Sequence, residues 1–326
     1  VMCKVLEVST SGFYKWRKEA PARSAKRQER VDAIVRVHEK GRGTYGSPRV
    51  VEGLREEGII YNHKSVEKLM REEGIRSKHS KKFKATTNSK HNLPVAENVL
   101  DREFQQPGPN QAWVSDITYV WTDEGWLYLV VFIDLWSRKI VGWSMSERMQ
   151  TQLVLDAFQM ACSRRQVSMQ ELIVHSDRGS QYASHLFRKL LAEKVCKQSM
   201  SRKGNCWDNA VSESFFGTIK KEMIYHEKFK TREAARIAIF DYIEIFYNRN
   251  RIHSALNYLT PRDWLLRSPA PGVNSWDFHK TSMGMVKTRS PICSRISSVV
   301  FFINLLRNRI SRINRMEEVG DRPRCG

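Results

Sequence analysis

Three consecutive apolar runs in the middle of the chain constrain its fold more than any other feature. The segments VSDITYVW, WLYLVVFIDLW and RKIVGWSMS, which lie between residues 113 and 146, are rich in aromatic and β-branched side chains. A turn at 122–125 separates the first two runs, and residues 137–138 link the second to the third. Apolar runs joined by such short links predict three antiparallel strands in succession. The chain is therefore expected to build a sheet here.

Helical and strand patterns alternate after these three runs. We expect helices over 151–163, 184–194 and 209–222, and strands over 171–177 and 195–200. A run of strands followed by alternating helices and strands predicts an α/β domain, with a mixed five-stranded sheet flanked by helices, in the order of a ribonuclease-H-like fold. One long amphipathic helix is expected over 231–256.

Two aspartates lie at the edges of the predicted strands. Asp116 shares a strand face with Val114, Thr118 and Val120, where a carboxylate is costly unless it has a partner. Asp177 directly follows a buried strand, and ligands gather at the carboxyl ends of strands in α/β sheets. Taken singly, Asp116 also fits a hydrogen-bonded structural aspartate, and Asp177 also fits a turn or cap residue.

A third acid, Glu213, projects from the predicted helix 209–222. The buried stripe expected for that helix consists of Ser212, Phe215, Phe216, Ile219 and Met223. On its own, Glu213 also fits a solvated helix glutamate. If the three acids converge, however, each raises the pKa of the others, so the arrangement requires cations between them. Hard divalent ions suit such oxygen ligands, Mg²⁺ first and Mn²⁺ next, and two ions support displacement at phosphorus.

The charge of the chain points to a polyanionic partner. It has 55 Lys and Arg against 35 Asp and Glu, a net charge of +20, and nucleic acid fits this spread charge better than a membrane does. The longest apolar run is too short to span a bilayer, and the sequence shows no signal peptide, so we expect a cytoplasmic, nucleoid-associated protein without a membrane partner. The six scattered cysteines suggest neither a disulfide framework nor a zinc site.

The charge and the patterns divide the chain into four parts. Residues 1–76 are basic and helical in pattern, with two short helices capped at Ser47 and Asn62. The two helices fit a helix-turn-helix and a plain helical hairpin equally well. Residues 77–108 are expected to form a basic linker, and residues 109–268 to form the α/β core with its closing helices. Residues 269–326 are basic and have no regular pattern, so we expect a disordered tail there.

Three blocks, WVSDITYV, HSDRGSQY and SMSRKGNCWDNAVSESFFGTIKKE, resemble the catalytic blocks of DDE transposases of the insertion-sequence-three family, which belong with retroviral integrases. Thirty-five residues separate Asp177 from Glu213, as in that family, and the resemblance extends over residues 1–265. It implies an integrase core in which Asp116, Asp177 and Glu213 are the catalytic, metal-binding triad. It also implies that Lys220, two helical turns beyond Glu213, contacts DNA near the reacting end.

The resemblance offers further candidates for contacts with DNA. Arg202 and Lys203 lie on the Gly- and Asn-rich loop before the triad helix, which the resemblance identifies as an active-site flap. Arg249 and His253 belong to the segment YNRNRIHSALNYLTP, which resembles the end of the family's core. We expect them on one helical face, although a structural histidine is as good an interpretation of His253.

The implied function is that of a transposase catalytic subunit that cleaves DNA strands and transfers them, using two Mg²⁺ or Mn²⁺ ions. Its implied partners are transposon ends, target DNA, the product of the element's first reading frame and further copies of itself. In that family the first frame usually encodes the recognition of the terminal repeats, so we expect this chain to lack that region. The 269–326 segment also departs from the family's short ending and fits read-through from a damaged element.

Three alternative functions are considered. A ribonuclease-H-like nuclease would hydrolyse DNA and stop. A non-enzymatic DNA-binding protein would be indifferent to alanine at the three acids. A tyrosine recombinase using Arg249, His253 and Tyr258 is disfavoured, because it would leave the three carboxylates without a role.

Overall fold

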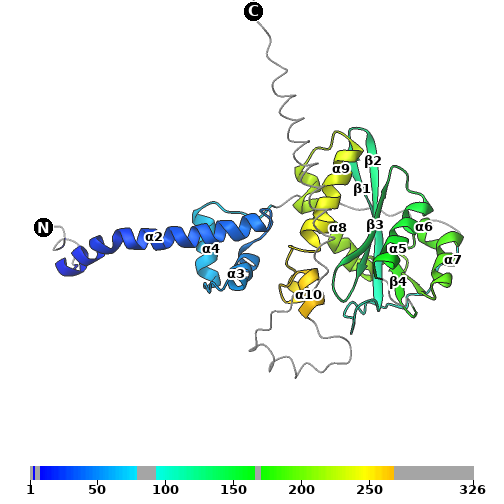
Figure 1. The fold of residues 1–326 in the computed structure, drawn as a ribbon, viewed down its shortest axis with the longest axis horizontal. Coiled ribbons are helices and arrows are strands. Elements are labelled where there is room, and N and C mark those ends of the chain that lie inside the picture. The colour runs from blue at the N-terminus through cyan, green and yellow to red at the C-terminus, as the bar shows by residue number, and fades with distance from the viewer. Residues whose placement is uncertain (1–2, 4–7, 79–92, 166–169, 268–326) are drawn as a thin grey trace, which may run out of the picture. The chain divides into compact units, whose positions relative to one another are not determined.

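The structure is a computed structural model that describes residues 3, 8–78, 93–165 and 170–267 (Figure 1). The predicted 269–326 tail and residues 79–92 of the predicted linker lie outside this range. Within the described residues, no helix combines the length and apolarity that crossing a membrane requires.

The first described region consists of three helices, α2 (Thr10–Lys40), α3 (Ser47–Glu56) and α4 (His63–Glu72). The expected cap of α4 is confirmed, since the Asn62 side chain accepts a hydrogen bond from the amide of Lys64 at 2.8 Å. The expected cap of α3 is wrong by one residue. Gly46 occupies the N-cap position, while Ser47 is the first helical residue.

The core is built on five strands, β1 (Ala112–Thr122), β2 (Gly125–Asp134), β3 (Ile140–Ser146), β4 (Ile173–Ser176) and β5 (Lys197–Met200). Their order in the sheet is β3-β2-β1-β4-β5. The first three strands are antiparallel neighbours, whereas β4 pairs parallel with both β1 and β5. The mixed five-stranded sheet expected from the sequence is thus confirmed.

Helices cover both faces of the sheet (Figure 1). One face carries α5 (Thr151–Arg165), α6 (Ser180–Ala183) and α7 (His185–Glu193), and the other carries α8 (Ala210–Glu222) and α9 (Arg232–Phe240). Helix α5 lies very close to β3, because a Cβ added at Gly142 would stand 2.2 Å from the carbonyl oxygen of Ala157. The core therefore depends on glycine at that position.

The closing segment departs from the single helix expected over 231–256. Helix α9 ends at Phe240 and continues as a π-helical segment, Asp241–Tyr247, after which the chain turns. A 3₁₀ turn, Ser254–Leu256, and α10 (Pro261–Arg267) follow. At the end of the π-helical segment the side-chain amide of Asn248 accepts from the Ile140 N–H at 2.9 Å and donates to the Ile140 carbonyl at 3.1 Å, which anchors this point of the chain to β3.

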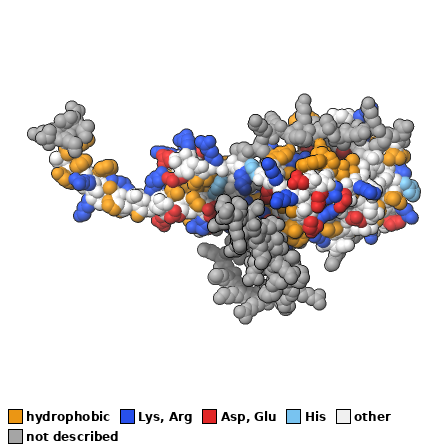
Figure 2. Space-filling view, turned by 90° about the horizontal axis from the view of Figure 1, so that it is seen from above, with side chains coloured by type: hydrophobic (Ala, Val, Ile, Leu, Met, Phe, Trp, Pro, Cys, Tyr) orange, Lys and Arg blue, Asp and Glu red, His pale blue; other side chains and the backbone are white. Residues whose placement is uncertain are grey.

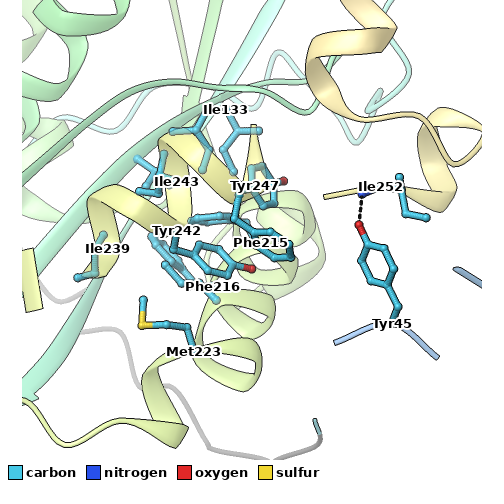
Figure 3. Close-up of a cluster of buried hydrophobic side chains, with 14 of the residues drawn as sticks. Tyr45, Ile133, Phe215, Phe216, Met223, Ile239, Tyr242, Ile243, Tyr247 and Ile252 are labelled. Carbon is cyan, nitrogen blue, oxygen red and sulfur yellow. Dashed lines mark hydrogen bonds between the residues drawn. The ribbon is translucent and has the colours of Figure 1, made fainter. Parts of the chain in front are cut away.

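The closing segment packs on α8 through apolar side chains. Figure 3 shows Phe215 and Phe216 of α8 among Tyr242, Ile243 and Tyr247, with Ile133 of β2 above them. All of these side chains are at most 5% exposed. This packing fixes the orientation of α8 and, with it, the direction in which its opposite face points.

Candidate active site

Sheet register places the two predicted aspartates side by side. In the parallel pairing of β1 with β4, Val114 stands opposite His175. This is the last residue pair between the two strands; two residues further along the chain come Asp116, still within β1, and Asp177, the first residue after β4. The Asp177 carboxylate also accepts a hydrogen bond from the Gly179 amide at 2.9 Å, which holds it at the start of its loop.

Helix α8 delivers the third predicted acid. Glu213 lies in the first turn of the helix and is exposed. The predicted buried stripe is confirmed, with exposed fractions at or below 7% for Ser212, Phe215, Phe216, Ile219 and Met223. Just before the helix, the Asn209 side chain donates to the carbonyl of Ser115 at 3.1 Å. This bond ties the start of α8 to the residue adjacent to Asp116.

Electrostatic coupling links the three acids. The pKa of Asp116 is raised well above its usual value, first by burial, then by the charge of Asp177 and also by that of Glu213. The hydrogen bond that Asp116 accepts from the Ile117 amide and the charge of Lys220 both act in the opposite direction. Burial raises the pKa of Glu213 as well. The structure therefore brings the three acids within electrostatic range of one another.

This donor set fits a hard divalent cation. Each residue contributes carboxylate oxygens, and a cation among them would relieve the repulsion that raises the pKa of Asp116. As placed, the side chains do not close into a finished ligand shell: among the residues that the structure describes, no three His, Cys, Asp or Glu side chains are grouped tightly enough to hold a metal. A bound ion would have to draw the carboxylates inward, above all Glu213.

Lys220 lies beside the acids, as its position two helical turns after Glu213 predicts. Burial lowers its pKa, and the charge of Asp116 opposes that effect. Its ammonium nitrogen stands 5.4 Å from the centre of the Tyr119 ring. The structure thus places this half-buried cation near Asp116 and the Tyr119 ring, and its contact with DNA stays a prediction.

The two basic residues of the flap differ. Lys203 is exposed. The guanidinium of Arg202 instead forms ion pairs with Asp208 at 2.8 Å and with Asp101 at 3.1 Å. The structure thus gives Arg202 a structural role, and phosphate contacts by either residue stay predictions.

The expectation that Arg249 and His253 share a helical face is wrong. The helix has ended by Tyr247, Arg249 lies exposed in a turn, and His253 forms an isolated β-bridge with Leu259. The His253 ring packs edge-on against Tyr247 at 4.8 Å. Burial, followed by the charges of Arg251, Arg49 and Arg138, lowers its pKa well below the usual value. These contacts favour a structural histidine.

Sequence reasoning missed the residues that hold the flap. Asp208 is fully buried, and its carboxylate accepts hydrogen bonds from Arg202, from Arg102 at 2.8 Å and from Asn98 at 3.0 Å. Asp208 belongs to the quoted CWDNA stretch, but its partners include residues about a hundred positions earlier in the chain. No local pattern in the sequence indicates that these residues pair.

A second missed cluster fixes the far end of α8. Glu222 pairs with Arg251 at 2.8 Å and accepts a hydrogen bond from the Tyr242 hydroxyl at 2.7 Å. Nearby, the Tyr45 hydroxyl accepts from the Ile252 amide at 3.1 Å, the contact drawn as a dashed line in Figure 3. Both ends of the triad helix are therefore held by polar contacts to other elements.

Comparisons with known families agree with this architecture. Residues 106–206 and 213–265 each match a family model described as an integrase core domain, and residues 25–83 match an HTH-like domain. The chain is thus a DNA-transaction protein of the integrase-core class. Basic side chains lie over the visible face of both the helical region and the core, interspersed with acidic ones (Figure 2).

Similarity to individual proteins defines the family more narrowly. The InsF transposase of insertion sequence IS3A from Escherichia coli (strain K12) is 46% identical over 266 residues, which cover 81% of this chain and 92% of the relative. An uncharacterised 31 kDa protein of insertion element IS600 from Shigella sonnei is 46% identical over 261 residues, 80% of this chain and 96% of its own length. The chain belongs to the IS3 family of transposases, enzymes of the polynucleotidyl transferase superfamily.

Solved structures also resemble it at low identity. A simian T-cell lymphotropic virus intasome in complex with PP2A regulatory subunit B56 gamma is 15% identical, covers 74% of this chain and 75% of its own, and has a TM-score of 0.42. The HTLV-2 integrase catalytic core domain in complex with magnesium is 19% identical, covers 48% of this chain and 95% of its own, and has a TM-score of 0.36.

Proposed function

We propose that this transposase cuts and joins DNA strands at the ends of its insertion element, with Asp116, Asp177 and Glu213 holding two divalent cations, Mg²⁺ or Mn²⁺. The observation that carries the proposal is the register of β1 and β4, which supports two carboxylates side by side at the end of a parallel pair. The raised pKa of Asp116 supports the same assignment, because a buried acid crowded by other acids is matched to a cation.

Each residue has a distinct part in the proposed chemistry. Bound divalent ions would supply activation of the attacking oxygen and stabilisation of the leaving oxygen in an in-line displacement at phosphorus. The two aspartates, on adjacent strands, provide the rigid side of the ligand set, while Glu213 closes it from α8. Lys220 holds a phosphate beside the reacting bond.

Two successive displacements give the product. Water attacks the phosphodiester at the element's end, and the 3′ oxygen leaves as a hydroxyl. That hydroxyl then attacks a phosphodiester of the target DNA, whose own 3′ oxygen leaves. No covalent protein intermediate forms, so Tyr258 has no part in either step.

The partners of this reaction follow from its geometry and from the family. Two element ends must meet a single target, so we propose that copies of the chain assemble on DNA. We further propose that the product of the element's first reading frame supplies recognition of the terminal repeats. Lys203 and Arg249, both exposed, remain candidates for contacts along the DNA backbone.

The test compares Glu213→Gln with Glu193→Gln, a matched change at an exposed glutamate in α7. Purified proteins, each mixed with the product of the first reading frame, receive labelled element ends and an unlabelled target in Mg²⁺ buffer, and cleaved and joined strands are resolved on denaturing gels. We expect wild type and Glu193→Gln to give both products and Glu213→Gln to give neither.

Other outcomes would point to other functions. Cleavage without joining by the wild type would favour a nuclease that hydrolyses and stops. Equal products from Glu213→Gln and wild type would remove Glu213 from the mechanism, and specific DNA binding without any product in all three proteins would favour a non-enzymatic DNA-binding protein.

A further inference from the structure

A cluster of exposed aromatic side chains surrounds the tip of the β1–β2 hairpin. Trp121 and Trp126 are 57% and 43% exposed, and Tyr225, on the segment after α8, is 41% exposed. The Trp126 ring packs edge-on against Trp121 at 4.7 Å and against Tyr119 at 4.9 Å between centroids. The phenol of Tyr225 lies close enough to Tyr119 to feel its charge. We call these four residues the aromatic cluster.

The cluster begins close to the proposed catalytic acids. Tyr119 follows Asp116 by three residues on β1, about 10 Å along an extended strand. Strand alternation puts its side chain on the opposite face from that of Asp116, so a DNA strand reaches the cluster from the acids around the edge of β1. The pairing of β1 with β4 stops at Val114, so that β1 continues past Asp116 as an edge strand. Lys220 connects the two sites across this edge, because its ammonium lies 5.4 Å from the Tyr119 ring centre and its charge acts on Asp116.

Hydrogen bonds to the segment after α8 hold the tip of the β1–β2 hairpin in place. The Asp123 amide donates to the Phe229 carbonyl at 3.0 Å, and the Arg232 amide donates to the Glu124 carboxylate at 2.8 Å. The Arg232 side chain also donates to the Trp126 carbonyl at 3.2 Å. A surface that is already ordered loses little conformational entropy when a ligand binds to it.

The charge around the cluster suits an anion better than a second protein surface. The segment 220–232, which packs against the hairpin tip, contains five Lys and Arg against two Asp and Glu, while the tip itself adds Asp123 and Glu124. Arg232 already pairs with Glu147 at 3.2 Å, so contacts with a ligand are assigned to the lysines of this segment. Of the two acids in the segment, Glu222 is already paired with Arg251. Exposed aromatic rings beside basic side chains are the combination with which proteins bind single-stranded nucleic acid, through stacking on bases and contacts to phosphates.

We propose that the aromatic cluster stacks unpaired bases of a DNA strand that leaves the catalytic acids, with Trp121 and Trp126 as the stacking surfaces. This inference rests on the proposed function for the source of the strand, but the binding itself requires no catalysis. The exposed rings accept any base, since every base has a π face. Strand separation next to the reacting phosphodiester would then be stabilised without sequence preference.

The test measures binding alone, in buffer without divalent ions, with the full chain. Labelled single-stranded oligothymidine and a labelled blunt duplex are titrated by fluorescence anisotropy, and the ratio of the two affinities is compared between variants. We expect Trp121→Leu to lower oligothymidine affinity about tenfold while leaving duplex affinity within about twofold, because a stacked base contributes on that scale. Trp121→Phe, which keeps an aromatic face, should retain most of the affinity.

Trp16→Leu is the matched control, a substitution of another exposed tryptophan, 60% exposed, in α2. It should leave the affinity ratio unchanged. Sedimentation and thermal melting of each variant accompany the titrations. A fall in oligothymidine affinity that appears with Leu but not with Phe at position 121, at unchanged melting temperature, supports stacking.

Three results would overturn the inference. Equal losses with Leu and Phe accompanied by lower melting temperatures would make Trp121 a structural residue. A change in oligomeric state without a change in affinity would make the cluster an interface between copies of this chain. Unchanged affinity in every variant would leave the rings without a role in binding. Each result is independent of cleavage and joining, so the proposed function stands or fails separately.

Discussion

Asp116, which is half-buried, and Asp208, which is fully buried, have opposite surroundings. Asp208, fully buried, receives donors from Arg202, Arg102 and Asn98, and hydrogen bonds led by those from Arg202 lower its pKa. Asp116 accepts the amide of Ile117, and burial together with neighbouring acids raises its pKa. The protein satisfies the charge of Asp208 internally, whereas the proposed function assigns the charge of Asp116 to a bound cation.

This difference separates structural acids from site acids. The pairs around Asp208 hold the flap and, through the adjacent Asn209, the start of α8. The crowding around Asp116 stabilises nothing in the absence of a cation, because like charges repel. A change at Asp208 should therefore affect mainly stability, and a change at Asp116 mainly activity.

The largest expected effect is that of Asp116→Asn on strand joining. We expect the joining rate to fall by at least about a thousandfold, about 4 kcal/mol in the barrier, because the ligand set loses one charge. The free energy of unfolding of Asp116→Asn, in metal-free buffer at neutral pH, should equal or exceed that of the wild type. An acid whose pKa is raised by folding destabilises the fold progressively as pH rises above its unfolded pKa, and asparagine carries no charge.

The check on Asp116→Asn is a gel assay of joining combined with thermal melting in EDTA. Asp156→Asn, an exposed position in α5, is the matched control and should leave both readouts unchanged. Joining at wild-type rate by Asp116→Asn would contradict the assignment of Asp116 as a site acid.

A smaller effect is expected for Asp208→Asn. Removing the charge weakens several charge-assisted hydrogen bonds, and we expect a loss of about 2 kcal/mol in the free energy of unfolding. Joining per folded molecule should fall far less than in Asp116→Asn. Urea titrations followed by tryptophan fluorescence measure the stability, and assays well below the melting temperature measure the activity. Unchanged stability would show that the ion pairs of the flap contribute nothing.

The smallest expected effect concerns His253 and pH. Its folded pKa is lowered, so only the unfolded chain takes up its proton as pH falls below about 6.5. Stability is then lost at up to about 1.4 kcal/mol per pH unit, until the folded pKa is reached. Urea titrations of wild type and His253→Gln between neutral and mildly acidic pH should show a weaker pH dependence in the variant. Identical slopes would argue that His253 is free to ionise when folded.

Local patterns predict most of the core. The strand runs, the alternation that follows them and the buried stripe beside Glu213 depend on the order of residues within one element, so β1 to β5 and α8 appear where expected. The proximity of Asp177 to Asp116, seen in the effect of its charge on the pKa of Asp116, was also expected from strand ends in one sheet, whereas the catalytic role of both stays a prediction.

What the sequence could not predict depends on contacts between distant segments. Residues 231–256 have a continuous helical pattern, but Asn248 bonds to Ile140, more than a hundred residues away, and the helix ends there. The same holds for Arg102 with Asp208 and for Arg251 with Glu222. None of these long-range contacts leaves a local pattern in the sequence, and the end of the helix before Arg249 and His253 was missed for that reason.

The central claim is that Asp116, Asp177 and Glu213 share a bound divalent cation, and direct titration with Mn²⁺ tests it. Free Mn²⁺ is followed by electron paramagnetic resonance as wild type, Asp116→Asn, Asp177→Asn, Glu213→Gln and the control Asp156→Asn are added without DNA. The account predicts that wild type and the control deplete free Mn²⁺, whereas the three site variants bind it much more weakly. Undiminished Mn²⁺ binding by Asp116→Asn and Asp177→Asn would contradict it.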